Sequence, residues 1–252
     1  MAFYHFLAIF PTLLMLHLAV KHIPGLSAQV RHPFAEALAT VLPREVVETV
    51  RSVAADFDKV QLPGWRFATT FAGVVWAGCN GTWAMIYGLN AAYEVEECRR
   101  PQELAITIVG LTIALAVISI LALGVVAGSA SLRSLVHAPI SLGFIEWIVL
   151  MAVLLFWFSI LYRFAPSLGN RKWEWSTPGA LVALILWVTA TFGARIYFEH
   201  FDSYHFSFGR LSGVAILLVW LYLVNGAILI GGELNSEIEK AADGRPSAPR
   251  KA

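Results

Sequence analysis

The chain has 252 residues, of which 58% are hydrophobic and only 14% charged, and its formal net charge is +1. A soluble domain carries about 25% charged residues, so this composition excludes an ordinary soluble protein. The 18 basic residues are balanced by 17 acidic ones and form no long run, so we expect no nucleic-acid partner. Two cysteines are too few to indicate a disulfide framework or a metal site.

Six apolar segments are long enough to cross a bilayer. An α-helix rises about 1.5 Å per residue and a hydrocarbon core is about 30 Å thick, so roughly 20 residues span it. We therefore predict an all-α integral membrane protein, a bundle of six transmembrane helices within residues 1–240. The predicted spans are 2–21, 67–90, 104–128, 141–163, 176–198 and 211–234.

The first span begins at the initiator without a basic leader or a small-residue cleavage site, so a removable signal peptide is not indicated and we expect an earlier start. The segment 34–60 follows it. Val46, Val50, Val53 and Phe57 recur there at helical spacing after Pro43, which predicts an amphipathic helix that lies on the membrane or on the bundle at the extracytoplasmic side. It could be a surface-bound connector or a lid over a cavity.

Basic residues in the short loops predict the orientation. Nine of them, including Arg99, Arg100 and Arg163, lie in the loops after the second and fourth spans and in the tail, against three in the alternate loops. This bias predicts that both termini are cytoplasmic. The tail, residues 241–252, is rich in Gly, Pro and charge and is predicted to be disordered.

The second span separates its side chains into two stripes. One is a small-residue strip where another helix could approach closely, formed by Gly73, Ala77, Gly81, Ala84 and Gly88. The other is aromatic and polar, formed by Trp76, Asn80, Trp83, Tyr87 and Asn90. An amide at mid-membrane depth is costly in lipid, so Asn80 should face protein or a cavity. The second stripe could line a substrate path or hydrogen-bond within a packed bundle.

Possible counterparts lie at similar depth in the last two spans: Trp187, Trp220, Tyr222 and Asn225. Glu146 is the one acid inside a predicted span and is either an interfacial residue or an ion or proton site. Glu233 and Asn235 end the sixth span, where an anchoring role competes with substrate contact. No residue grouping has metal-ligand spacing and no nucleotide-binding loop is present, so we expect no metal and no cofactor.

Six segments of the chain have a distinctive sequence: Ala2-Phe-Tyr-His-Phe-Leu-Ala-Ile-Phe-Pro11, Asn90-Ala-Ala-Tyr-Glu-Val-Glu-Glu-Cys-Arg-Arg-Pro101, Leu161-Tyr-Arg-Phe-Ala-Pro166, Trp175-Ser-Thr-Pro-Gly-Ala180, Phe201-Asp-Ser-Tyr204 and Gly232-Glu-Leu-Asn235. Together they resemble the YihY/BrkB family of bacterial inner-membrane proteins. Glu94 departs from that pattern, because the family usually has Gly there.

The resemblance implies a six-helix protein of the bacterial inner membrane. Family members have been labelled as a transfer-RNA-processing ribonuclease or as serum-resistance factors, but these residues offer no clustered carboxylates or histidines for phosphodiester cleavage. Our hypothesis is a non-enzymatic transporter or translocator of a lipid or amphiphilic envelope precursor. The alternative is a membrane scaffold for envelope biogenesis, and a homo-oligomer or an envelope-protein partner fits either.

Overall fold

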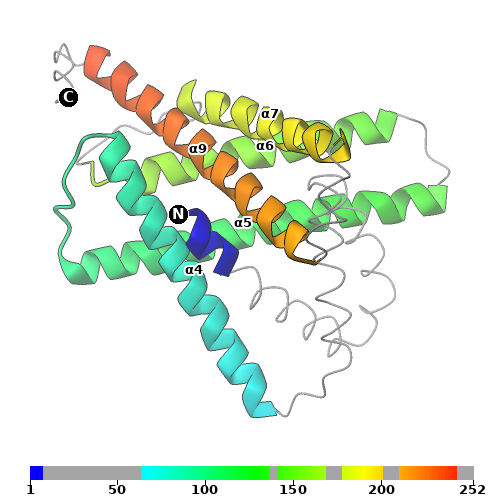
Figure 1. Ribbon diagram of the computed structural model, residues 1–252, viewed down its shortest axis with the longest axis horizontal. Coiled ribbons are helices and arrows are strands. Elements are labelled where there is room, and N and C mark those ends of the chain that lie inside the picture. The colour runs from blue at the N-terminus through cyan, green and yellow to red at the C-terminus, as the bar shows by residue number, and fades with distance from the viewer. Residues whose placement is uncertain (8–63, 137–140, 169–177, 201–209, 243–252) are drawn as a thin grey trace.

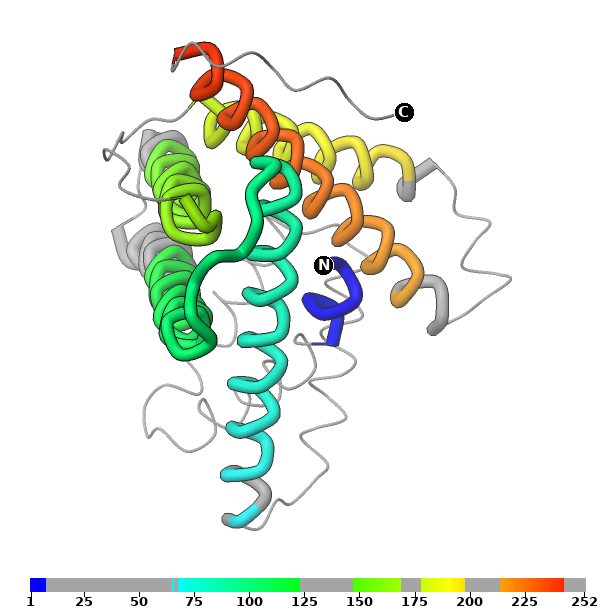
Figure 2. The backbone as a smooth tube through the Cα atoms, turned by 90° about the vertical axis from the view of Figure 1, so that its left-hand side faces the viewer, coloured from blue at the N-terminus to red at the C-terminus, as the bar shows by residue number. Residues whose placement is uncertain are grey.

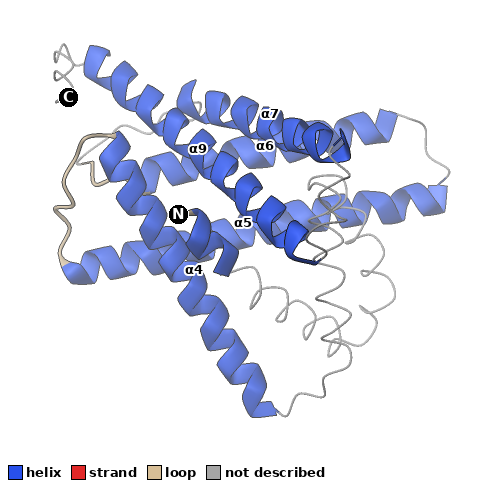
Figure 3. Ribbon diagram, viewed as in Figure 1, coloured by secondary structure: helices blue, strands red, loops and turns tan. Residues whose placement is uncertain are grey.

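The computed structural model describes residues 1–7, 64–136, 141–168, 178–200 and 210–242 (Figure 1). Regular structure in these ranges is helical, and Figure 3 shows helices joined by loops. A short helical segment covers residues 2–7. The long helices are α4 (Gly64–Ala92), α5 (Pro101–Val136), α6 (Ser141–Phe164), α7 (Pro178–His200) and α9 (Arg210–Ala242). The all-α prediction is therefore confirmed for the described part of the chain.

Four helices in the described ranges are long and apolar enough to cross a membrane: Pro101–Ala122, Trp147–Phe164, Pro178–Tyr197 and Val214–Ala242. Helix α4 is uncharged after Arg66, but Gly, Thr, Trp and Asn make it less apolar than these four. Most of the predicted first span and the segment 34–60 lie outside the described residues. The count of six spans therefore stays a prediction.

Two helices run further than the sequence predicts. α5 continues to Val136, past the predicted end at residue 128, and α9 continues to Ala242, two residues into the predicted tail. A membrane span can end without ending its helix, because the Glu, Lys, Arg, Ala and Leu residues of these extensions are good helix formers in water as well. The rest of the tail, 243–252, lies outside the described residues.

One end of the bundle collects most of the helix termini (left in Figure 1). Helices α4, α6 and α9 end there, and α5 and α7 begin there (Figures 1 and 2). α7 and α9 share the most extensive contact, α5 packs on α6, α6 on α7, and α4 touches both α9 and α5. We call this side of the molecule the polar end.

The small-residue strip of α4 packs as predicted. Ala77 and Ala84 are buried, and so is Gly81. A Cβ atom on Gly81 would lie 3.2 Å from the ring of His5, and one on Gly88 would reach Met1 and Leu229 of α9. The strip therefore receives the N-terminal segment and α9.

α7 and α9 cross at a pair of glycines. A Cβ on Gly179 would overlap the Gly231 carbonyl oxygen, and a Cβ on Gly231 would overlap the Tyr162 hydroxyl. That hydroxyl is buried and donates to the Ile228 carbonyl at 2.7 Å. The largest hydrophobic cluster, which includes Leu89 and Leu161, lies around this crossing.

Candidate functional site

Helix α4 ends in a left-handed residue at the polar end. Glu94 has φ of 53°, the Val95 amide donates to the Asn90 carbonyl at 2.9 Å, and the Glu94 amide donates to Ala91 at 3.1 Å. This pair of bonds is the Schellman cap, which usually places Gly at the left-handed position. The left-handed φ gives a physical reason for the Gly that the resembled family pattern implies at the position of Glu94.

The Asn90 side chain joins the α4–α5 loop to the segment after α6. Its Nδ2 donates to Glu97 Oε2 at 2.9 Å, and its Oδ1 accepts from the Ser167 amide at 2.8 Å. Arg99 pairs with both oxygens of Glu97, at 2.7 and 2.8 Å, and also donates to the Ala165 carbonyl at 2.7 Å. Asn90 is 5% exposed and therefore acts here as an anchor between loops.

These contacts set the charge state of Glu97. Partial burial acts to raise its pKa, but hydrogen bonds from Arg99 and Asn90 and the Arg99 charge outweigh that effect and lower the pKa from 4.5 to about 2. The carboxylate is therefore ionised at neutral pH, and its two-bond pairing with Arg99 has the geometry of a strong charge-assisted contact.

The last helix caps the beginning of α7. Asn235 Oδ1 accepts from the Gly179 amide at 2.8 Å, and Pro178, which has no N–H, takes the first helical position. The anchoring role considered for Asn235 is thus observed. One turn further on, Lys240 pairs with Glu94 at 2.8 Å and with Glu237 at 2.9 Å. The polar end is held by contacts between helices distant in the sequence.

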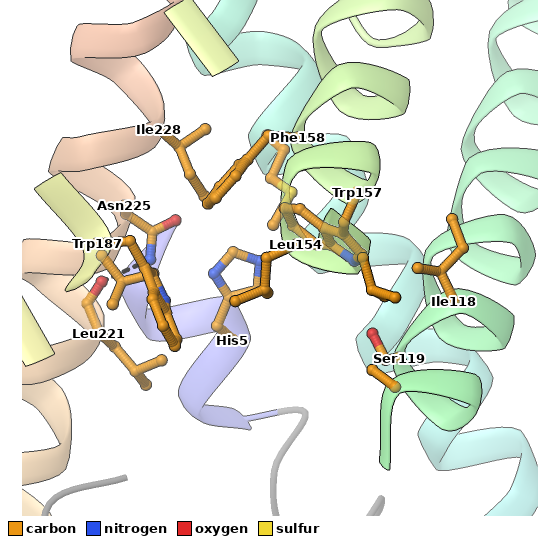
Figure 4. Close-up of a pocket in the computed structure, with 14 residues that line it drawn as sticks. His5, Ile118, Ser119, Leu154, Trp157, Phe158, Trp187, Leu221, Asn225 and Ile228 are labelled. Atoms are coloured by element: carbon orange, nitrogen blue, oxygen red, sulfur yellow. Dashed lines mark hydrogen bonds between the residues drawn. The ribbon is translucent and has the colours of Figure 1, made fainter. Parts of the chain in front are cut away.

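A cavity of about 270 Å³ lies in the middle of the bundle (Figure 4). The N-terminal segment and all five long helices contribute to its wall, which is mostly aliphatic and aromatic. We call it the central cavity. It is lined by His5, Met85, Ile118, Ser119, Ala122, Val153, Leu154, Trp157, Phe158, Trp187, Leu221, Val224, Asn225 and Ile228.

Besides Ser119 and the two Trp indoles, His5 and Asn225 bring polar atoms into a mostly apolar space. The His5 ring and the Asn225 amide lie on the same side of the central cavity (Figure 4). Asn225 Nδ2 donates to the Leu221 carbonyl at 2.7 Å, whereas Oδ1 lies beside the His5 ring and makes no hydrogen bond of full geometry in the part of the chain that the structure describes. A buried acceptor without a donor costs roughly 1–3 kcal/mol, so this oxygen is placed for an additional partner.

A second hollow lies between α7 and α9. This groove has a volume of about 520 Å³, and we call it the α7–α9 groove. Asn225 lines it as well as the central cavity. The complete lining is Met1, Ala2, Leu186, Thr189, Ala190, Tyr222, Leu223, Asn225, Gly226, Ala227, Leu229 and Ile230.

The structure separates the predicted site residues. Trp187 and Asn225 line the central cavity, and Tyr222 lines the α7–α9 groove. Trp220 is buried and donates to the Thr191 hydroxyl at 3.3 Å, a contact between α9 and α7. Glu233 is half-buried, and the side chain of Glu146 lies outside the described residues.

The aromatic stripe of α4 lies elsewhere. Trp76, Trp83 and Tyr87 are exposed and line neither the central cavity nor the groove. Asn80 is half-buried and donates to its own helix, at the Trp76 carbonyl, at 2.7 Å. A substrate-lining role for these four residues stays a prediction.

His5 was not among the predicted site residues, although it faces the central cavity. A signal existed, because an ionisable side chain inside an apolar span is by default a candidate for function. Gly226 and Thr189, which shape the groove, gave no such signal in the sequence. Within the described ranges, no three His, Cys, Asp or Glu side chains gather in a metal-binding group.

Comparisons with known proteins identify a family whose model matches this chain. The family model described as virulence factor BrkB matches residues 1–252. YfkH of Bacillus subtilis (strain 168), whose name describes it as ribonuclease-like, is 28% identical over 253 residues, which covers 95% of this chain and 88% of YfkH.

Two further relatives match over a shorter stretch. A UPF0761 membrane protein of Tolumonas auensis is 33% identical over 79 residues, 31% of this chain and 26% of that protein. A UPF0761 membrane protein of Xanthomonas oryzae pv. oryzae (strain PXO99A) is 35% identical over 88 residues, 35% of this chain and 20% of that protein. No solved structure matches the chain.

Proposed function

This chain belongs to the virulence factor BrkB family, and on that premise we propose that it binds an amphiphile at the central cavity and moves it across the bilayer. Its apolar helices and its relatives named as membrane proteins make it a multi-pass membrane protein. The amphiphile is proposed to be a lipid or a lipid-like envelope precursor. We also propose the bacterial inner membrane as its location, with both termini and the polar end on the cytoplasmic side.

The unpartnered Oδ1 of Asn225 is the observation that carries the proposal. The Asn225 side chain is 5% exposed, sits on a helix apolar enough to cross a membrane, and faces the central cavity. Lipid tails supply no hydrogen-bond donor, so a donor for this oxygen has to come from a polar group that enters the protein. A substrate hydroxyl or amide would supply that donor.

The size and charge of the central cavity support a particular kind of substrate. Its volume of about 270 Å³ is close to the lower end of the range for small-molecule pockets, about 300 Å³. It therefore fits the polar part of an amphiphile rather than a whole lipid. No carboxylate, Lys or Arg is among its lining residues, which favours an uncharged hydrogen-bonding group.

The variant Asn225→Leu tests the proposal. Leu removes the amide but keeps a similar size, so the free energy of unfolding should be unchanged or higher, because an unpaired acceptor is lost. Translocation of fluorescent lipid analogues by reconstituted protein should nevertheless fall to the background rate. Val219→Leu, on an exposed position of α9 that lines neither hollow, is the matched control. Normal translocation by Asn225→Leu would contradict the proposal.

A membrane scaffold for envelope biogenesis is the second candidate. It is favoured by the exposed aromatic stripe of α4, where Trp76 is 60% and Tyr87 is 68% exposed. Such a face could hold another membrane protein, and residue-specific photo-cross-linking from position 76 in cells should then recover one stoichiometric partner. Recovery of lipid alone would contradict the scaffold. An enzymatic role is not part of either proposal.

A further inference from the structure

We infer that the α7–α9 groove holds the alkyl chain of a membrane lipid whose polar group reaches Asn225. The role of this site in translocation rests on the proposed function, whereas binding of the alkyl chain can be measured on its own. The sequence analysis named Tyr222 and Asn225, which line this groove, but no pattern indicated the hollow itself. Its position, lining and shape carry the inference.

Small residues create the hollow. Gly226 and Ala227 on α9 and Ala190 on α7 line the groove, and a Cβ atom on Gly226 would meet no atom within 4 Å. The same helix pair leaves no such space at its crossing, where a Cβ on Gly179 would overlap Gly231. The glycine at position 226 therefore keeps a space open and does not serve helix packing.

The wall of the groove is suited to hydrocarbon. No charged side chain lines it, and the hydroxyl of Thr189 already donates to the Ile185 carbonyl at 2.8 Å. Asn225 Nδ2 is likewise engaged with its own helix. Among the described side chains of this wall, apart from the Tyr222 hydroxyl, Asn225 Oδ1 next to Gly226 is the polar atom that makes no hydrogen bond of full geometry.

The surroundings and the size of the groove identify the occupant. α7 and α9 both contain segments apolar enough to span a bilayer, and Tyr222, Leu223 and Ile230 at the groove are exposed, so lipid tails are the medium at its mouth. A helix with side chains is about 10–12 Å wide and rises 5.4 Å per turn, so one turn takes up about 500 Å³. A groove of about 520 Å³ holds little more than one such turn, which favours an alkyl chain over a partner helix.

The groove also adjoins the central cavity. Met1 and Ala2 line the groove, His5 lines the cavity one helical turn later, and Asn225 lines both. The N-terminal segment and Asn225 therefore stand between the two spaces. A lipid with its tail in the groove would present a hydroxyl or amide to Oδ1 of Asn225 without passing through water.

Photolabelling tests the inference on the full-length chain. We would place the protein in nanodiscs of phosphatidylethanolamine and phosphatidylglycerol containing a phospholipid with a diazirine in its acyl chain, and map the labelled residues by mass spectrometry. The wild type should be labelled at 222–230 and 186–190. Gly226→Leu fills the groove and should reduce this labelling about tenfold, equivalent to about 1.4 kcal/mol of binding free energy. Gly226→Val should reduce it less.

Gly193→Leu is the matched control. Gly193 lies on α7, a Cβ there also meets no atom within 4 Å, and it does not line the groove. Its labelling should equal that of the wild type. Unchanged labelling in Gly226→Leu or equal loss in Gly193→Leu would each overturn the inference. Groove labelling by a wild type that translocates no lipid would refute the proposed function and leave the alkyl-chain site standing.

Discussion

Asn90 and Asn225 show how differently the polar end and the middle of the bundle use the same amide. Both side chains are 5% exposed. Asn90 uses its oxygen and its nitrogen to join two loops, whereas Asn225 uses its nitrogen on its own helix and leaves its oxygen facing the central cavity. Segments that resemble the family therefore occur in both regions: Asn90 and Asn235 anchor helices at the polar end, and His5 lines the central cavity together with Asn225.

The largest effect should come from filling the helix crossing at the polar end. Gly179→Leu forces a side chain against the Gly231 backbone, which cannot move aside as a flexible side chain would, so we expect little folded protein. Gly193→Leu on the same helix should fold normally. Size-exclusion chromatography in detergent measures both. A well-folded Gly179→Leu protein would show that the helix crossing at the polar end is not more tightly packed than the middle of the bundle.

A smaller but more informative difference should separate the two asparagines. Asn90→Leu leaves the Ser167 amide without its acceptor and Glu97 without one donor, so the free energy of unfolding should fall by about 2 kcal/mol or more. Asn225→Leu should not lower it. Equilibrium unfolding in mixed micelles compares them, and equal destabilisation of the two variants would show that both amides serve packing.

As the pH falls, the polar end should lose stability before the middle of the bundle does. The pKa of Glu97 is lowered from 4.5 to about 2, so the unfolded chain binds the proton at a higher pH than the folded protein. The stability that Glu97 contributes is therefore complete above about pH 4.5 and is lost as pH falls toward 2. Thermal melts of the wild type should show this loss, and Glu97→Gln should lack that component. A Glu97→Gln protein with the same acid dependence would assign the effect to another group.

The smallest predicted effect concerns the left-handed residue. Glu94→Gly and Glu94→Ala both lose the contact with Lys240, but only Gly adopts φ of 53° without strain. The Gly variant should therefore be more stable than the Ala variant by about 1 kcal/mol. Melting temperatures of the pair test it, and an Ala variant as stable as the Gly variant would indicate that the loop relaxes to another conformation.

The sequence predicts where the helices lie, but it does not predict which helices contact each other. Uncharged runs locate the five long helices, and the spacing of Gly81, Ala84 and Gly88 correctly predicts a packed strip. The same helical spacing cannot say which neighbour the Trp76 stripe meets, because that depends on how helices far apart in the sequence cross. His5 shows the same difficulty, since its position in the central cavity follows from packing by α4 and α9. The residue type at position 94 did not indicate a left-handed backbone, because Glu rarely adopts that conformation.

The cap that Asn235 places on α7 has a consequence for biosynthesis. The Gly179 amide finds its acceptor only in the last helix, 56 residues further along the chain. A ribosome releases α7 well before that residue, so the first turn of α7 is completed only after α9 has been synthesised and inserted beside it. A chain that stops at residue 234 would contain all six predicted spans but leave α7 uncapped, and we expect cellular proteases to recognise that unfinished helix end.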